Sequence, residues 1–332
     1  MRSTTVLLHV LQKEQPDIVH LQCINEHFVN IYRLIGYLRD KQVPTLLTLH
    51  ADFMFTANCG SALACEGYRS GCRTCHEVKR ATKSIVFNRT AESFELLQEA
   101  FEGFGENLSV VSVSPWLMER AKESPMLAGF RHATITNGVD TRVFRPVDAK
   151  GLRERYSLGS QSIVLHVTAQ FDDAPGHLKG GAHLFKLARR MANEPVIFVV
   201  IGPHRTSDAV PENVLMLGSL SDANELACWY TAASCTVLTS QQETFSLVCA
   251  ESLCCGTPVV GFRAGGPESI AMHEASAFVS YGDVDALENC VQMFLAGERK
   301  NRLAIAEQAH LWYANEVMVR RYEEEYRRMQ CL

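Results

Sequence analysis

Short apolar segments alternate with helical segments along the chain, and the alternation starts a second time after residue 146. In the first half, residues 17–23 and 45–50 have the composition of buried strands, and a helical pattern over 29–41 separates them. The second half repeats this scheme with expected strands at 162–170, 195–202, 235–240 and 258–262. A strand–helix–strand order calls for a parallel sheet covered by helices. The sequence therefore predicts an α/β protein made of two parallel-sheet halves.

The two halves join in the segment TNGVDTRVFRP, which has a turn at Asn137-Gly138 and ends at Pro146. We expect a first domain over residues 1–143, which contains an irregular cysteine-rich loop over 51–81. A second domain is expected over 144–310, followed by a charged amphipathic helix over 311–332. Two facing halves of this kind place a ligand in the cleft between them.

Charge and hydropathy exclude several classes of protein. The chain of 332 residues has a net charge of −5, which argues against a dedicated nucleic-acid binder. Its longest apolar run, near residues 196–201, is far shorter than the roughly 20 residues that cross a bilayer. The apolar stretch at 6–11 is too short for a secretion signal. The 12 cysteines then fit a reducing compartment, and we predict a cytoplasmic protein with no nucleic-acid partner.

The segment QQETFSLVCAESLCCGTPVVGFRAGGP, residues 241–267, is the most informative in the chain. Seven residues separate Glu243, in the loop after an expected strand, from Glu251, inside the following helix. Free N–H groups at the start of that helix suit an anionic ligand, and two carboxylates can accept hydrogen bonds from sugar hydroxyls. A capped helix with two solvated glutamates explains the spacing equally well, so the residues alone leave both interpretations open.

Several motifs in a fixed order carry a resemblance to a known family. The segment 241–267 resembles the E-x7-E signature of the GT-B-fold retaining glycosyltransferases of family 4, TNGVDTRVFRP resembles their interdomain linker, and HLKGG resembles their donor-domain lysine-glycine. TLHADFMFTANC, the cysteines after it and SVSPWLMERAKES resemble a bacterial cell-surface polysaccharide subgroup that includes the colanic-acid type. The resemblance implies two Rossmann-like domains facing across a cleft, with the C-terminal helix crossing back to the first domain.

The family's functional residues map onto matching positions in this chain. The resemblance implies that Lys179 contacts the donor diphosphate and that Glu251 binds the nucleotide ribose. Glu243 would hold the transferred sugar together with the backbone of the next three residues, Thr244, Phe245 and Ser246. Leu220 lies in the loop that frames the base, and His50 matches the family's histidine near the reacting sugar. Lys179, Glu243 and His50 are thus the predicted catalytic residues, although a solvated lysine and a structural histidine are the plain alternatives.

The chain departs from the family at three places. Ala174 stands where relatives often carry a second diphosphate-binding arginine, and Arg205 is the candidate substitute. Ala51 replaces an aspartate that follows the histidine in the subgroup. Ser246 replaces a glycine, and we expect it to add a side chain near the sugar.

Four cysteines fall within the loop over 51–81. Cys59, Cys65, Cys72 and Cys75 have the spacing C-x5-C-x6-C-x2-C, which is typical of a structural tetrahedral zinc site. A loop this long needs something to order it, and zinc would do so. Unligated thiols, a redox-active pair, and another metal or an iron–sulfur cluster are the alternatives, and His76 is an alternate ligand. The family's motifs include no DxD here, so no catalytic metal is expected.

A basic cluster follows this loop at Lys79, Arg80, Lys83 and Arg89. Such a run usually forms a solvated face. Its functional interpretation is contact with anionic headgroups or with a polyprenyl-diphosphate acceptor at the inner membrane surface.

Together these features predict a retaining glycosyltransferase of cell-surface polysaccharide or lipopolysaccharide biosynthesis. It would transfer a sugar from a UDP- or GDP-linked donor to a glycan or polyprenyl-linked acceptor. A nucleotide-sugar epimerase of the same fold, or an inactive sugar-nucleotide-binding partner of a polysaccharide assembly, are the alternatives. The first half begins with a helix and a strand that resemble the later part of the family's acceptor domain. We therefore expect the family's first strand and glycine-rich loop to be missing. Donor binding depends less on these parts than full transferase activity does.

Overall fold

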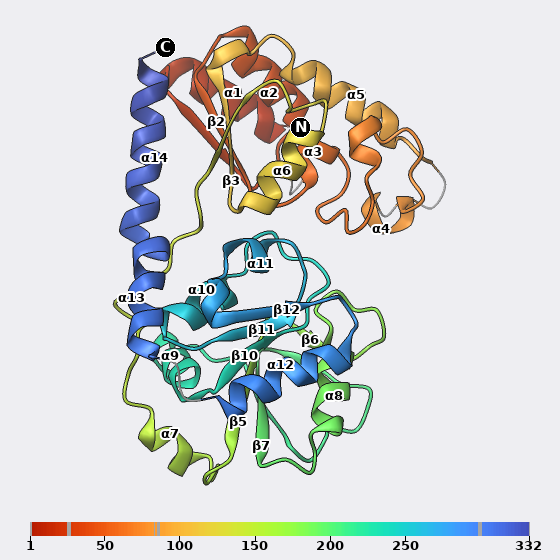
Figure 1. The fold of residues 1–332 in the computed structure, drawn as a ribbon. Helices are drawn as coiled ribbons and strands as arrows, with labels where there is room; N and C mark the ends of the chain where they lie inside the picture. Colours follow the sequence, from red (N-terminus) through yellow and green to blue (C-terminus); the bar gives the residue numbers. More distant parts are fainter. Residues whose placement is uncertain (1, 25–27, 83, 85–86, 298–300, 332) are drawn as a thin grey trace. The chain divides into compact units, whose positions relative to one another are not determined.

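The computed structural model describes residues 2–24, 28–82, 84, 87–297 and 301–331. The chain forms two compact units, one of residues 1–136 with 319–332 and the other of residues 137–318 (Figure 1). The division falls inside the TNGVDTRVFRP segment. Each unit contains a parallel sheet with helices, as the alternation of strand and helix patterns predicted.

The first unit is built on a four-stranded parallel sheet in the order β1-β2-β3-β4. The strands are β1 (Val19–Gln22), β2 (Thr45–Leu49), β3 (Leu108–Ser112) and β4 (Arg131–Thr134). The main helices are α1 (Arg2–Glu14), α2 (Ile31–Asp40), α5 (Thr90–Phe101) and α6 (Pro115–Glu123), with a short helix η2 (Gly105–Asn107) before β3. Every residue of β2 and β3 is buried, which explains why apolar and small polar residues without any charge make up both strands. Ser114 caps α6 by accepting from the Leu117 N–H, with Pro115 in the first turn.

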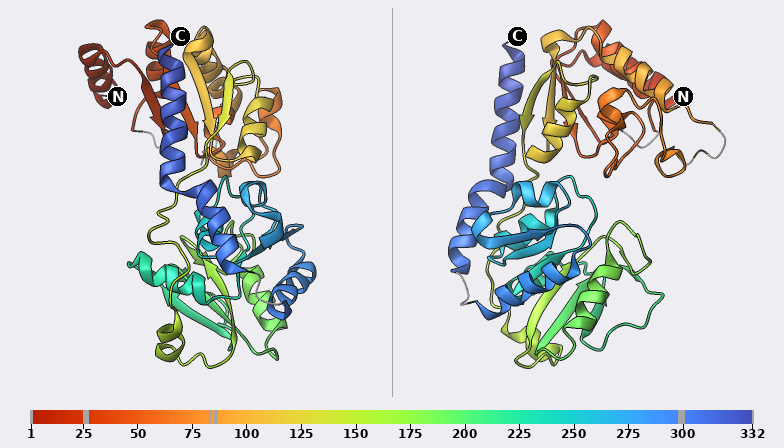
Figure 2. Two further views of the ribbon diagram at one scale, coloured as in Figure 1. Left: turned by 60° about the vertical axis from the view of Figure 1, so that its left-hand side comes forward. Right: turned by 45° about the vertical axis from the view of Figure 1, so that its right-hand side comes forward.

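The last helix, α14 (Asn315–Gln330), packs on this sheet from Val319 onward (Figure 2). The Tyr326 hydroxyl lies 2.7 Å from Nδ1 of His20, and the Tyr322 hydroxyl lies 3.1 Å from the Thr48 hydroxyl. Polar contacts between tyrosines of the helix and residues of β1 and β2 therefore fix the helix on the sheet.

The segment 51–81 is better ordered than the sequence suggested. It contains three short helices, α3 (Phe53–Thr56), η1 (Gly67–Ser70) and α4 (Val78–Thr82), so the expectation of a wholly irregular loop was wrong. Phe55 and Tyr68 are buried with their ring centroids 5.2 Å apart. The guanidinium of Arg120 lies 5.0 Å from the Tyr68 ring centroid and 3.5 Å from the buried Asp52 carboxylate. Apolar packing and a buried ion pair thus anchor the segment, a signal that spacing alone does not reveal.

The second unit is built on a six-stranded parallel sheet in the order β12-β11-β10-β5-β7-β9. Its strands are β5 (Ser162–Val167), β7 (Val196–Ile201), β9 (Val214–Gly218), β10 (Cys235–Leu238), β11 (Val259–Phe262) and β12 (Ser276–Val279). Two further short strands, β6 (Phe171–Asp172) and β8 (His204–Arg205), pair with each other. The helices are α7 (Lys150–Arg155), α8 (Gly181–Arg190), α9 (Ala223–Ala232), α10 (Leu247–Cys254), α11 (Gly266–Ile270), η3 (His273–Ala275), α12 (Val284–Ala296) and α13 (Arg302–Tyr313).

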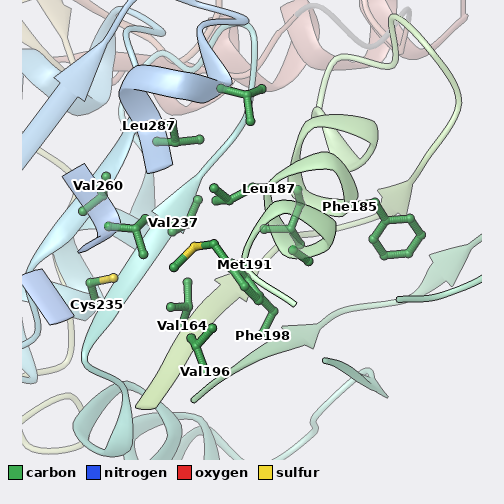
Figure 3. Close-up of a cluster of buried hydrophobic side chains, with 14 of the residues drawn as sticks. Val164, Phe185, Leu187, Met191, Val196, Phe198, Cys235, Val237, Val260 and Leu287 are labelled. Atoms are coloured by element: carbon green, nitrogen blue, oxygen red, sulfur yellow. The ribbon is translucent and has the colours of Figure 1, made fainter. Parts of the chain in front are cut away.

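Helices cover both faces of this sheet, and each face has its own core. On one face, side chains of α8 and α12 interlock with those of β5, β7 and β10 (Figure 3). On the other face, Trp229 and Tyr230 of α9 are completely buried. The chain order runs outward from β5 in one direction and from β10 in the other. The switch point of this doubly wound sheet, where such folds bind ligands, therefore lies between the ends of β5 and β10.

Candidate functional site

The switch point brings together Lys179 and Glu243, which are distant in the sequence. Lys179 follows β5 and the short strand β6, in the loop before α8, and Glu243 lies in the loop between β10 and α10. The Lys179 Nζ and Glu243 Oε1 atoms are 2.6 Å apart, and the two side chains are 33% and 25% exposed. A cation and a carboxylate thus stand at the edge where an α/β sheet takes up phosphates and sugars.

Backbone contacts hold the two loops in register. The Gln241 N–H donates to the Leu178 carbonyl at 2.8 Å, and the Thr239 hydroxyl donates to the Lys179 carbonyl at 2.9 Å. Gly180 has a φ of +68°, and a Cβ there would lie 2.0 Å from the Thr239 carbonyl oxygen. Only glycine allows this approach, which explains why a glycine follows the lysine.

A second set of backbone contacts fixes the start of α10. The Glu243 N–H donates to the Ala264 carbonyl at 2.9 Å, and the Gly266 N–H donates to the Glu243 carbonyl at 2.8 Å. A Cβ on Gly266 would lie 2.5 Å from the Phe245 nitrogen, so the glycine after β11 lets the two loops touch. Phe245 is 3% exposed, and Thr244 is half-buried.

Ser246 occupies a backbone conformation that favours glycine, with φ at 79°. Its hydroxyl caps α10 by accepting from the Cys249 N–H at 3.3 Å. The side chain that replaces the family's glycine is therefore engaged with the helix backbone in this structure.

Glu251 lies on α10, with its carboxylate beside α9. The Tyr230 hydroxyl donates to Glu251 Oε2 at 2.9 Å. Burial raises the pKa of Glu251 to about 7, although the hydrogen bond from Tyr230 acts in the opposite direction. Sequence reasoning missed Tyr230, because a tyrosine in an amphipathic helix carries no motif.

The structure also places Leu220, Arg205 and the acidic stretch before Lys179, which the sequence motifs assigned to the donor side. Leu220 follows β9, is half-buried and packs against the core that contains Trp229. Arg205 is exposed on β8 beside Asp172 of β6. The Asp173 carboxylate accepts from the backbone N–H groups of Ser207 and Asp208, both at 2.8 Å. The acidic stretch before Lys179 therefore shapes the loop after β8.

His50 belongs to the first unit, where it follows β2. Its Nε2 lies 3.0 Å from Oε1 of Gln22, and burial lowers its pKa. Its neighbour His20 bonds Tyr326 of α14 and Thr48, and burial lowers the pKa of His20 to about 4, with the charge of His50 adding to the effect.

The four cysteines of the segment 51–81 are free thiols, as are the other eight in the chain. Burial, together with the charges of neighbouring cysteines, raises the pKa of Cys59 to about 11 and that of Cys72 to about 12. Among the described residues, no group of three or more His, Cys, Asp or Glu side chains is arranged to hold a metal ion. Zinc binding at these cysteines does not follow from the geometry and stays a prediction from the sequence.

The basic cluster after this segment is partly neutralised. Arg80 pairs with Glu77 at 2.9 Å, and Arg89 pairs with Glu92 at 3.6 Å. Lys79 is exposed and shares a surface pocket with Phe87, whose side chain is 69% exposed. Lys83 lies outside the described residues. In the part of the chain that the structure covers, no helix is long and apolar enough to cross a membrane.

Comparison with known proteins agrees with the geometry of the second unit. Residues 167–297 match the family described as Glycosyl transferases group 1, so the chain carries a domain of this kind, which includes Lys179, Glu243 and Glu251. A D-inositol 3-phosphate glycosyltransferase of Thermomonospora curvata is 31% identical over 258 residues, which are 69% of this chain and 60% of the relative. D-inositol 3-phosphate glycosyltransferase 1 of Catenulispora acidiphila is 29% identical over 49% of this chain and 44% of the relative. The chain thus covers less than two thirds of these relatives.

Solved structures show the fold over nearly the whole chain. The sucrose-phosphate synthase of Thermosynechococcus elongatus has a TM-score of 0.67 at 20% identity, over 98% of this chain and 77% of that one. The Anabaena protein Alr3699/HepE, solved in complex with UDP, has a TM-score of 0.67 at 14% identity, over 97% of this chain and 81% of that one. The predicted fold class, α/β with parallel sheets of the GT-B type, is confirmed.

Proposed function

We propose that this protein is a retaining glycosyltransferase that takes a sugar from a UDP- or GDP-linked donor. The observation that carries the proposal is the pair Lys179 and Glu243 at the switch point, with Glu251 on the helix that begins four residues after Glu243. A lysine for the diphosphate, a carboxylate for sugar hydroxyls and a second carboxylate for a ribose would contact three parts of such a donor. The matched domain supports the transferase class, and the solved neighbour with UDP supports the type of donor.

Catalysis would depend on position and charge. Lys179 and the N–H groups at the start of α10 stabilise the diphosphate as the bond from sugar C1 to its phosphate oxygen breaks. A new bond forms from C1 to the acceptor oxygen on the same face, and the acceptor proton passes to the departing phosphate oxygen. Glu243 holds the transferred sugar. These groups supply the charge themselves, so turnover should persist in EDTA.

Calorimetry with UDP and with GDP tests the proposal. Lys179→Ala and Glu251→Ala should each weaken binding of the preferred nucleotide by roughly tenfold or more, since each removes a charged hydrogen-bonding partner. Affinities like that of the wild type in both variants would overturn the assignment. Retention is tested by the anomeric configuration of the product in NMR. Donor conversion without acceptor would instead indicate an epimerase, and donor binding without turnover an inactive partner.

The proposed acceptor is a glycan or a polyprenyl-linked glycan in cell-surface polysaccharide assembly, of the colanic-acid type. The cysteine-bearing segment and SVSPWLMERAKES support this class. The similar proteins are named D-inositol 3-phosphate glycosyltransferases. The assay should therefore offer a membrane extract and, separately, inositol 3-phosphate as acceptors. Transfer of labelled sugar to a membrane extract, with none to inositol 3-phosphate, is the expected result. The opposite pattern would replace the proposed acceptor by a phosphorylated cyclitol.

Because the proposed acceptor is linked to a lipid, we also propose that the protein lies in the cytoplasm and contacts the inner face of the membrane. Lys79 and Phe87 support this location, because an exposed cation beside an exposed aromatic ring suits an anionic lipid surface. Co-sedimentation with vesicles rich in anionic lipid should exceed that with neutral vesicles. The double variant Lys79→Glu and Phe87→Ser should sediment equally with the two kinds of vesicle. Equal sedimentation of the wild type with both would contradict membrane contact.

A further inference from the structure

Tyr230 is the one hydrogen-bonding partner that the structure gives to the carboxylate of Glu251 within the described residues. The tyrosine has no exposed surface, and its hydroxyl meets Glu251 Oε2 across the gap between α9 and α10. An ionised carboxylate has about four acceptor positions on its two oxygens, and the phenol uses one of them. The bond therefore limits the rotation of the carboxylate while leaving acceptor capacity for a diol.

The linker segment packs against the ring of Tyr230. The rings of Phe144 and Tyr230 meet edge to face, with centroids 6.2 Å apart and planes at 67°. The Phe144 carbonyl lies 3.2 Å from Nε2 of His310 on α13, and the same nitrogen lies 3.0 Å from the Cys254 carbonyl at the end of α10. Through His310, Phe144 is thus tied to the same helix that carries Glu251.

From these contacts we infer that Tyr230 is a positioning residue, which orients the Glu251 carboxylate toward the two ribose hydroxyls of the nucleotide. Phe144 holds the tyrosine ring in place for this task. The role rests on the proposed function, because it presupposes that Glu251 binds a ribose. If Tyr230 is purely structural, its substitution should weaken the binding of all nucleotides alike. If it is a positioning residue, its substitution should weaken only the binding of nucleotides with an intact ribose diol.

The test compares UDP with 2′-deoxy-UDP by calorimetry, or GDP with 2′-deoxy-GDP if the protein prefers guanine. The wild type should bind the ribonucleotide roughly tenfold more tightly, since the deoxy form leaves one acceptor of Glu251 without its hydroxyl. In Tyr230→Phe the ring still packs, but the hydroxyl is lost, and we expect the preference to fall to about threefold or less, mainly through weaker ribonucleotide binding.

Tyr156→Phe is the matched control. Tyr156 also donates to a glutamate of the second unit, Glu225, at 3.3 Å, and its ring packs on Trp229. This variant should keep the wild-type preference. A wild type that binds neither UDP nor GDP would overturn the proposed function itself. A wild type that discriminates, with Tyr230→Phe discriminating equally well or losing affinity for both nucleotides in the same proportion, would overturn only the positioning role.

Discussion

Nζ of Lys179 lies 2.6 Å from Oε1 of Glu243. The lysine proposed to bind the donor diphosphate is therefore ion-paired with the carboxylate proposed to bind the donor sugar. The two residues are 64 positions apart in the sequence and meet because β5 and β10 are neighbours in the sheet. A diphosphate that binds Lys179 must compete with this carboxylate and also approaches its negative charge.

Glu243→Gln should therefore bind UDP or GDP more tightly than the wild type, by about three- to tenfold, because the amide neither neutralises Lys179 nor repels the phosphates. The same variant should transfer sugar more slowly, because the contact to the transferred sugar is altered. Calorimetry and a turnover assay measure the two effects. Weaker binding of the free nucleotide in this variant would show that Glu243 is not a competitor for Lys179.

Glu251 should make the folded state less stable as the pH rises. Burial raises its pKa from 4.5 to about 7, so between these values the folded chain holds a proton that the unfolded chain has lost. The free energy of unfolding then falls with rising pH across this window. Glu251→Gln removes the penalty and should raise the free energy of unfolding by roughly 1–3 kcal/mol at pH 8, with little change near pH 4.5. Urea unfolding at both pH values, without nucleotide, measures this, and an equal effect at both would contradict it.

Substitutions of Ser246 separate the cost of its strained backbone from the benefit of its hydroxyl as the N-cap of α10. Its positive φ costs on the order of 1 kcal/mol for a residue with a Cβ, while its hydroxyl caps α10. Ser246→Gly relieves the strain and loses only a few tenths of a kcal/mol in capping, so the variant should be as stable as the wild type or more so. Ser246→Ala keeps the strain and loses about 1 kcal/mol of capping. Denaturant melts should rank glycine above alanine, and the reverse order would refute the strained conformation.

The segment 51–81 should keep its fold through Arg120. Its guanidinium lies 5.0 Å from the ring of Tyr68 and 4.8 Å from that of Trp116, beside the buried carboxylate of Asp52. Arg120→Leu leaves that carboxylate without its cation and should cost about 3 kcal/mol in the free energy of unfolding. Chelator treatment tests the zinc site predicted for the four cysteines. If zinc binds there, chelation should lower the wild-type melting temperature and added zinc should restore it, whereas an unchanged melting temperature would contradict the zinc site.

The sequence determined the class of fold and the order of its parts. The periods of the apolar residues encode local structure directly, so they indicated two parallel sheets. The motif order also pointed to Lys179, Glu243 and Glu251 in a single matched domain.

Only the tertiary structure decided which of these side chains meet. The strand order places β5 beside β10 and so pairs Lys179 with Glu243, and the packing of α9 against α10 gives Glu251 its partner Tyr230. The same is true of the cysteine-rich segment, which Arg120 anchors from the later helix α6. Local patterns cannot predict such contacts, because they depend on which strands and helices become neighbours, and that follows from the packing of the whole unit.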